Sequence, residues 1–117
     1  MNKVYVIRGL GDCGGNRVFD VYKNLNVAMA CMKVHELYNE EHNDFEDLQI
    51  VEFEVELLGD TVYLVVGDDD CGSDDLIDVC NTLEGAHLSM LQDDEERKKW
   101  YGESMYAEYV IREVTLL

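Results

Sequence analysis

The sequence predicts an α+β fold made of tandem ββαβ repeats, with about six strands in a mostly antiparallel sheet and two helices packed on it. Three observations support this. The chain nearly repeats itself, its apolar residues alternate in some segments and recur at helical spacing in others, and 47% of its 117 residues are hydrophobic. The pattern is also compatible with two half-sheets. We expect units 1–58 and 59–117, related by a pseudo-twofold axis, to share one core as one compact domain.

The repeat is visible by direct alignment. Residues 4–32, VYVIRGLGDCGGNRVFDVYKNLNVAMACM, align without a gap with residues 62–90, VYLVVGDDDCGSDDLIDVCNTLEGAHLSM, and 11 of 29 positions are identical. Residues 51–58 and 110–117 also agree once one residue is inserted between the blocks. Agreement over this length indicates a duplicated unit of roughly 58 residues.

Each unit is expected to begin with two strands. In the first unit, residues 4–8 form a β-branched and aromatic run, residues 9–16 a Gly-rich loop, and residues 18–22 a second strand. Glycine permits positive φ in a long hairpin loop, and Asp side chains bond to nearby amides. We therefore interpret the Asp-Cys-Gly sequence common to both loops as a determinant of backbone shape.

A helix follows the second strand in each unit. Apolar positions with helical spacing predict it: Leu25, Ala28, Met29 and Met32 in the first unit, and Leu83, Ala86, His87, Met90 and Leu91 in the second. Asn24 can cap the first helix, and Thr82 or Asn81 the second. The helices are expected to extend to about Tyr38 and Tyr101.

The last strand of the first unit alternates. Val51, Phe53, Val55 and Leu57 share one face, and Glu52, Glu54 and Glu56 share the other, about 6.8 Å apart along the strand. Gly59-Asp60 then predicts a two-residue type II′ hairpin to the first strand of the second unit.

Charge restricts the possible partners. Nine Lys and Arg face 26 Asp and Glu, a formal net charge of −17. Such a surface repels nucleic acid and anionic membranes, so direct binding to either is not expected, whereas a basic protein surface would be attracted. The second unit carries 15 acids and 4 bases against 11 and 5 in the first, so the partner-facing side is expected there.

The sequence also favours an intracellular protein. It contains no apolar run of membrane-spanning length, and its first residues are too soon interrupted by charge for a secretory signal. The four cysteines, Cys13, Cys31, Cys71 and Cys80, form no C-x-x-C pair and are most simply reduced thiols of a cytoplasm.

No residue pattern indicates catalysis, and we predict neither enzymatic activity nor a cofactor. Phosphate-binding, nucleophile-elbow and zinc-protease motifs are absent from the sequence. The loop GDDDCGSDD (67–75) could gather oxygens around a divalent cation, but it departs from the calcium-loop pattern, and no metal ligand is assigned. Carboxylates around Cys71 would disfavour its thiolate.

The stretch RKKWYGESMYAEY (97–109) combines three basic residues with four aromatic ones. These aromatic residues can close the core where the last helix meets the last strand. Alternatively, Trp100 and a tyrosine are exposed anchors of a protein interface, where such residues are enriched.

In small size, strong acidity and lack of catalytic motifs, the chain resembles phage-encoded inhibitors of host defence, the anti-CRISPR and anti-restriction proteins that mimic DNA. The resemblance implies a non-enzymatic protein in the cytoplasm of a bacterial host cell, which binds and inhibits a basic nucleic-acid-binding protein or complex. The residues expected to contact this partner are Glu52, Glu54, Glu56, Asp68, Asp69, Asp70, Asp74, Asp75, Asp93, Asp94, Glu95, Glu96 and Trp100.

The sequence is also compatible with two other functions. The two Asp-Cys-Gly loops could form a module that binds a small ligand or a divalent cation. The chain could also be a general acidic adaptor subunit that uses the patch around Trp100.

Overall fold

The computed structural model describes residues 1–11, 15–69, 72–103 and 106–117. The elements follow the order β1 (Asn2–Leu10), β2 (Arg17–Tyr22), α1 (Leu25–His42), β3 (Asp47–Val55), β4 (Thr61–Asp68), β5 (Asp74–Cys80), α2 (Leu83–Tyr101) and β6 (Glu108–Thr115). The predicted α+β class is confirmed.

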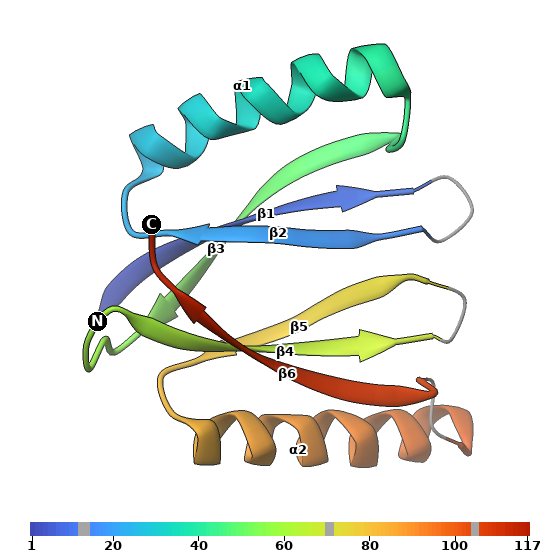
Figure 1. Ribbon diagram of the computed structural model, residues 1–117. Helices are drawn as coiled ribbons and strands as arrows, with labels where there is room; N and C mark the ends of the chain where they lie inside the picture. Colours follow the sequence, from blue (N-terminus) through green and yellow to red (C-terminus); the bar gives the residue numbers. More distant parts are fainter. Residues whose placement is uncertain (12–14, 70–71, 104–105) are drawn as a thin grey trace.

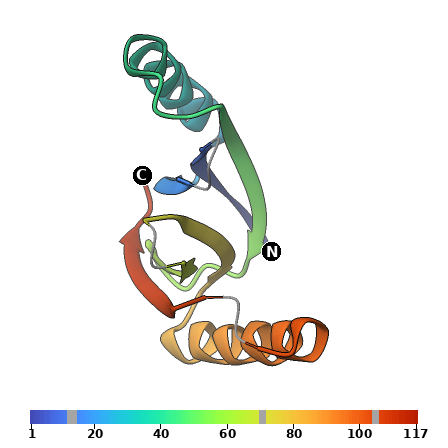
Figure 2. The same ribbon diagram turned by 90° about the vertical axis from the view of Figure 1, so that its right-hand side faces the viewer.

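The strands form two antiparallel three-stranded sheets, in the orders β2-β1-β3 and β5-β4-β6. The sheets face each other, and one helix covers the outer side of each (Figures 1 and 2). The prediction of one six-stranded sheet carrying both helices is therefore wrong, and the alternative of two half-sheets is the observed arrangement. The layers follow the order helix, sheet, sheet, helix.

The central strands β1 and β4 are buried on both faces. Val4 and Val6 of β1 pack with Val62 and Leu64 of β4 in the core between the sheets. Ile7, on the opposite face of β1, packs instead under α1. Burial on two sides explains why these strands are nearly continuous apolar runs rather than alternating ones.

The helices begin as predicted but bury less than predicted. Asn24 caps α1, and Thr82 caps α2 by accepting a hydrogen bond from the Gly85 amide. The helices bury only small or slender side chains, Ala28 and Met32 in α1 and Ala86 in α2.

The other predicted core positions on the helices are partly or largely exposed: Leu25, Met29, Leu83, His87, Met90 and Leu91. Three strands about 4.8 Å apart span only about 10 Å. Such a narrow sheet covers one strip of a helix and leaves the flanking apolar positions outside.

The predicted hairpin at Gly59-Asp60 is also wrong. The strands on either side of it, β3 and β4, belong to different sheets, so residues 56–60 form a crossing between layers. Gly59 lacks the positive φ that a type II′ turn requires at its first central position.

Two glycines assigned to loops from the sequence lie within strands. Gly9 belongs to β1 and Gly67 to β4, and neither has a positive φ. A Cβ at Gly9 would lie 2.7 Å from the ring of Phe45, and a Cβ at Gly67 would lie 2.6 Å from the ring of Tyr106. Each glycine therefore makes room for an aromatic ring that follows a helix. Gly72, by contrast, has the positive φ expected of a loop glycine, at 86°.

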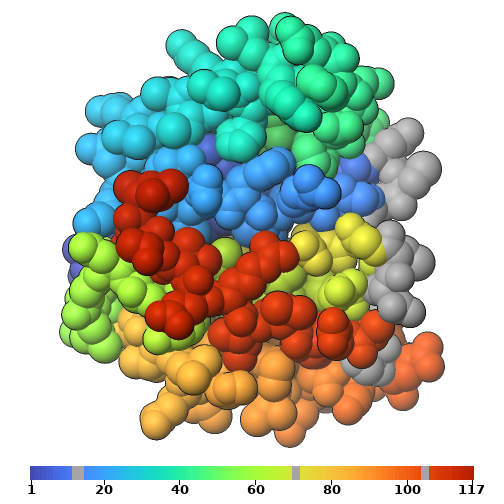
Figure 3. Space-filling model, viewed as in Figure 1, coloured from blue at the N-terminus to red at the C-terminus, as the bar shows by residue number. Residues whose placement is uncertain are grey.

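The end of the chain links the two sheets. After β6, the Leu117 amide donates to the Val21 carbonyl of β2, and the Lys23 amide donates to the Leu117 carbonyl. Figure 3 shows this last segment, in red, lying against β2, in blue. Leu116 is buried in the core between the sheets.

Within the described part of the chain, no helix is both long and apolar enough to cross a lipid bilayer.

Candidate acidic interface

The fold brings three acidic segments to one end of the molecule. The C-terminal ends of α1 and α2, the ends of β1 and β4 and the starts of β2 and β5 all lie on the right-hand side of Figure 1. Residues 36–47, 68–69, 72–75 and 93–96 belong to this end, which we call the hairpin end. Their carboxylates within the described residues are Glu36, Glu40, Glu41, Asp44, Glu46, Asp47, Asp68, Asp69, Asp74, Asp75, Asp93, Asp94, Glu95 and Glu96.

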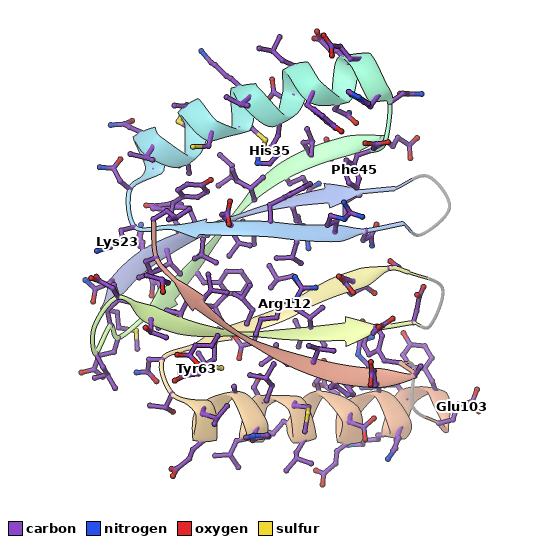
Figure 4. The ribbon with its side chains drawn as sticks, viewed as in Figure 1. Lys23, His35, Phe45, Tyr63, Glu103 and Arg112 are labelled. Atoms are coloured by element: carbon purple, nitrogen blue, oxygen red, sulfur yellow. The ribbon has the colours of Figure 1, made fainter. Side chains whose placement is uncertain are left out.

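The β4–β5 hairpin carries the first group, and its carboxylates are held by the fold. Asp74 accepts a hydrogen bond from Arg112 Nη2 at 2.6 Å, and Asp75 accepts one from Asn16 Nδ2 at 2.8 Å. Arg112 points into the space between the sheets (Figure 4), and its Nη1 also approaches the Val18 carbonyl, at 3.5 Å. Asp74 and Asp75 thus connect the second sheet to the first.

The backbone at Ser73 and Asp74 is held by further hydrogen bonds. The Asp74 amide donates to the Asn16 carbonyl at 2.9 Å, and the Asn16 amide donates to the Ser73 hydroxyl at 3.1 Å. Ser73 is buried, and its own amide donates to the Asp69 carboxylate. Asp68 also lies at this end, as the last residue of β4. Asp70 and Cys71, like the Asp12-Cys13-Gly14 sequence of the other hairpin, lie outside the described residues.

The hairpin connects with α2 through two tyrosines. The Tyr106 hydroxyl donates to Asp75 at 3.2 Å, and the Tyr109 hydroxyl donates to Asp93 at 2.7 Å. Arg97 lies over the Tyr106 ring at 4.9 Å from its centroid and forms an ion pair with Asp93 at 2.7 Å. These contacts join β5, α2, β6 and the segment before β6 into one network.

The network changes the acidity of its members. Burial, together with repulsion from Asp75, raises the pKa of Tyr106 to about 12. Burial and the hydrogen bond to Asp93 also raise the pKa of Tyr109 above its ordinary value. Both hydroxyls are therefore neutral hydrogen-bond donors at physiological pH.

The outer side of α2 presents the remaining predicted carboxylates. Asp94 forms an ion pair with Lys98 at 2.9 Å, while Glu95 and Glu96 are exposed. Trp100 is 73% exposed, next to a hollow of about 390 Å³ that Asp93, Glu96, Arg97 and Tyr101 also line.

The aromatic stretch divides into a partly buried pair and an exposed pair. Tyr106 and Tyr109 are partly buried and pack edge to face, with ring centroids 5.4 Å apart. The Tyr106 ring covers Gly67 of β4. Trp100 and Tyr101 are exposed instead.

The glutamates of β3 lie away from this group. Asp47 begins β3 at the hairpin end, and Glu54 lies seven residues further on, about 24 Å away at the rise of a strand. Glu52 and Glu54 are exposed, and Glu52 approaches Lys3 at 3.7 Å. Glu56 follows β3, where its carbonyl accepts a hydrogen bond from Asn81. The structure thus separates these three predicted contacts from the acids of the hairpin and α2.

The structure adds an acidic group that sequence reasoning did not select. Glu36 and Glu40 of α1 and Glu46 and Asp47 before and in β3 line a hollow of about 280 Å³. Asn39 shapes the turn between them by hydrogen bonds with both the amide and the carbonyl of Phe45. The density of acids in residues 40–47 was visible in the sequence, but only the turn brings Glu36 and Glu40 beside Glu46 and Asp47.

Cys80 does not have the properties of a nucleophile. Cys31 and Cys80 are free thiols. Burial and the neighbouring Asp78 charge raise the pKa of Cys80 to about 11, so its thiolate is scarce at neutral pH. No group of three or more His, Cys, Asp or Glu side chains suited to a metal ion occurs in the part of the chain that the structure describes.

The hairpin end is therefore a concentration of carboxylates, several of which are held by hydrogen bonds and ion pairs. Comparisons with protein-family models, with curated protein sequences and with solved structures found no match to this chain.

Proposed function

We propose that the protein is a non-enzymatic inhibitor that binds a basic, nucleic-acid-binding protein or complex by presenting the hairpin end in place of a polyanion. The observation that carries this proposal is the gathering of residues 36–47, 68–69, 72–75 and 93–96 at one end of the fold. The resemblance to anti-CRISPR and anti-restriction proteins, and a cytoplasmic location in a bacterial host, are parts of the same proposal.

Electrostatics supports this choice of partner. Duplex DNA carries one charge per about 1.7 Å of axis, and a groove that binds it is lined with Lys and Arg. A chain with a net charge of −17 is attracted to such a groove and repelled by nucleic acid itself. Its attraction is concentrated where the carboxylates are densest, because screening limits each charge to about 8 Å at physiological salt.

Rigidity supports mimicry over a diffuse acidic surface. Asp74, Asp75 and Asp93 are each held by a side chain from outside their own element, at 2.6 to 2.8 Å. Glu95 and Glu96 project from a helix. Fixed carboxylates lose less conformational entropy on binding than carboxylates on a disordered tail.

Trp100 gives this surface an apolar contact. It is exposed in the last turns of α2, beside Glu96. Exposed tryptophans often dominate the binding energy of an interface. We therefore assign Trp100 to the margin of the same binding surface.

The proposal is tested with immobilised protein and bacterial lysate. Basic nucleic-acid-binding proteins should be retained at low salt, and both added salt and duplex DNA should displace them. Displacement by DNA is the decisive step, since it shows that the chain occupies the nucleic-acid groove. Retention of no basic protein at low salt, or retention that DNA leaves unchanged, contradicts the proposal.

Two matched variants locate the surface. Glu95→Gln with Glu96→Gln removes two charges from the hairpin end, and Glu54→Gln with Glu56→Gln removes two from the opposite end. The first variant should weaken binding by roughly 3- to 30-fold, because each exposed ion pair contributes roughly 0.3–1 kcal/mol. The second should weaken it much less. Equal losses would mean that net charge alone drives binding.

We also propose that the chain is a tandem pair of ββαβ repeats, residues 1–58 and 59–117. The matching strand orders of the two sheets support this, as does the shared use of a strand glycine under an aromatic ring. Equivalent hydrogen bonds add support: the Leu57 amide donates to the Asn2 side chain, and the Leu116 amide donates to the Asp60 carbonyl. Expression of each unit alone tests their dependence on one another, and we expect neither to fold by itself.

A further inference from the structure

The outer face of α1 lacks the charge that covers most of the molecule. Among the 26 acids of the chain, none occurs in residues 25–35, and Lys33 is the single charged residue of that stretch. On α2, by contrast, Glu84, Asp93, Asp94, Glu95 and Glu96 all occur. Acids are absent from this exposed stretch although the chain as a whole is strongly acidic. Their absence suggests a contact with another apolar surface, which carboxylates would destabilise.

This face is apolar and points away from the sheet. Val34 is 66% exposed, Leu37 63% and Tyr38 57%, and Val27 and Ala30 are also exposed. These five positions fall on one side of the helix, since they follow the spacing i, i+3, i+7, i+10 and i+11. The residues that contact the sheet, Ala28 and Met32 among them, lie on another side. We call Val27, Ala30, Val34, Leu37 and Tyr38 the α1 face.

We propose that the α1 face is the contact of a twofold homodimer, in which two copies of α1 pack antiparallel. A second copy is the partner that fits, because its own α1 face is equally apolar. The one acid in line with this face, Glu41, lies in the last turn of α1, where it can stay in contact with water. The basic target of the proposed inhibitor is a poorer fit, because none of the five residues of the α1 face carries a carboxylate for it to bind. This inference does not depend on the proposed function.

The antiparallel direction follows from charge and side-chain size. Glu36, Glu40 and Glu41 lie in the last turns of α1, so a parallel pair would place six carboxylates side by side. An antiparallel pair places these turns against the uncharged first turns and brings Lys33 toward Glu40 of the other copy. Leu37 then packs near the small Ala30 of the other copy, where the helices can approach closely.

The distribution of charge permits this dimer. α1 and α2 cover opposite outer sides of the molecule (Figure 2), so the helix with the denser charge faces away from the contact. Residues 59–117 carry a net charge of −11 and residues 1–58 carry −6. Repulsion between the outer halves is screened over about 8 Å at physiological salt.

The expected dimer is weak. A helix of 18 residues is about 27 Å long, and one helix pair buries less than the roughly 1,200 Å² of a standard stable interface. Association should therefore depend on protein concentration and increase with added NaCl, which screens the charge of −17 on each copy. The hairpin ends remain exposed in both copies.

Sedimentation equilibrium over a wide range of protein and NaCl concentrations tests the dimer. We expect the average mass of the wild type to rise toward twice the chain mass, and Leu37→Glu to remain a monomer under the same conditions. Leu88→Glu is the matched control, because Leu88 is 60% exposed on α2 and the added charge is identical. It should associate as the wild type does.

Leu37→Lys and Val34→Lys separate apolar contact from repulsion. Each lowers the net negative charge by one, yet each should also abolish association, because a charge would be buried in the contact. A wild type that stays monomeric at every concentration and salt would overturn the proposal. So would equal loss of association in Leu88→Glu and Leu37→Glu, or unimpaired association of both Lys variants.

Discussion

Replacing Gly67 by alanine adds one methyl group under the ring of Tyr106. The new Cβ would lie 2.6 Å from two ring carbons and 2.7 Å from a third, whereas carbon atoms normally approach to about 3.5–4.0 Å. The ring must therefore move outward by about 1 Å. It cannot move freely, because its hydroxyl is bonded to Asp75 at 3.2 Å and Arg97 lies on its face.

The cost can be worked out from these contacts. Overpacking of this kind destabilises a protein by about 1–3 kcal/mol, and a weakened hydrogen bond adds about 0.5–1.5 kcal/mol. Alanine is favoured over glycine within a strand by about 0.5–1 kcal/mol, which offsets part of the loss. We expect Gly67→Ala to lower the free energy of unfolding by about 1–3 kcal/mol.

A double-mutant cycle with Tyr106→Ala isolates the cause. Without the ring, Gly67→Ala should stabilise the protein by about 0.5–1 kcal/mol, so the coupling between the two sites is about 1.5–4 kcal/mol. Urea unfolding followed by circular dichroism measures all four proteins. Gly59→Ala is the control, because a Cβ there meets no atom within 4 Å. An equal cost of Gly67→Ala in both backgrounds would refute the explanation.

Two further predictions concern the space between the sheets and the response to pH. Arg112→Met should lower the free energy of unfolding by about 1–2 kcal/mol, because Asp74 loses its ion-pair partner at 2.6 Å. Adding Asp74→Asn to this variant should recover most of the lost stability in the same urea assay. An Arg112→Met variant as stable as the wild type would contradict this prediction. Stability should also fall as the pH rises from about 9 to 12. Burial raises the pKa of Cys80 from 9.0 to about 11 and that of Tyr106 from 10.0 to about 12, so the folded state holds protons that the unfolded chain releases. Urea unfolding between pH 8 and 11 should show a shallower decline for Cys80→Ala, and an identical decline would exclude Cys80 as a cause.

Local features of this fold could be predicted from the sequence because they depend on neighbouring residues. The side chains of Asn24 and Thr82 accept hydrogen bonds from amides two or three residues ahead, so the starts of both helices were predictable. The six strands were visible as β-branched runs. The assignment of α+β class required no knowledge of distant contacts.

The acidic interface was only partly predictable, because its geometry depends on contacts between residues far apart in the sequence. Clusters such as 68–75 and 93–96 stand out in the sequence, but their distance from Glu52, Glu54 and Glu56 depends on the direction of β3 in its sheet. The roles of Asp74 and Asp75 depend on Arg112 and Asn16, which lie 38 and 59 residues away. No local pattern contains contacts of that range.

The sequence by itself therefore determined the element order, the helix caps and the excess of negative charge, since each is set by residues close together in the chain. The tertiary structure decided that the strands divide into two facing sheets, that Gly9 and Gly67 lie under aromatic rings, and that most acids gather at one end. These outcomes depend on which apolar faces cover one another. That choice is made by packing of the whole chain, where residues far apart in sequence exclude water together.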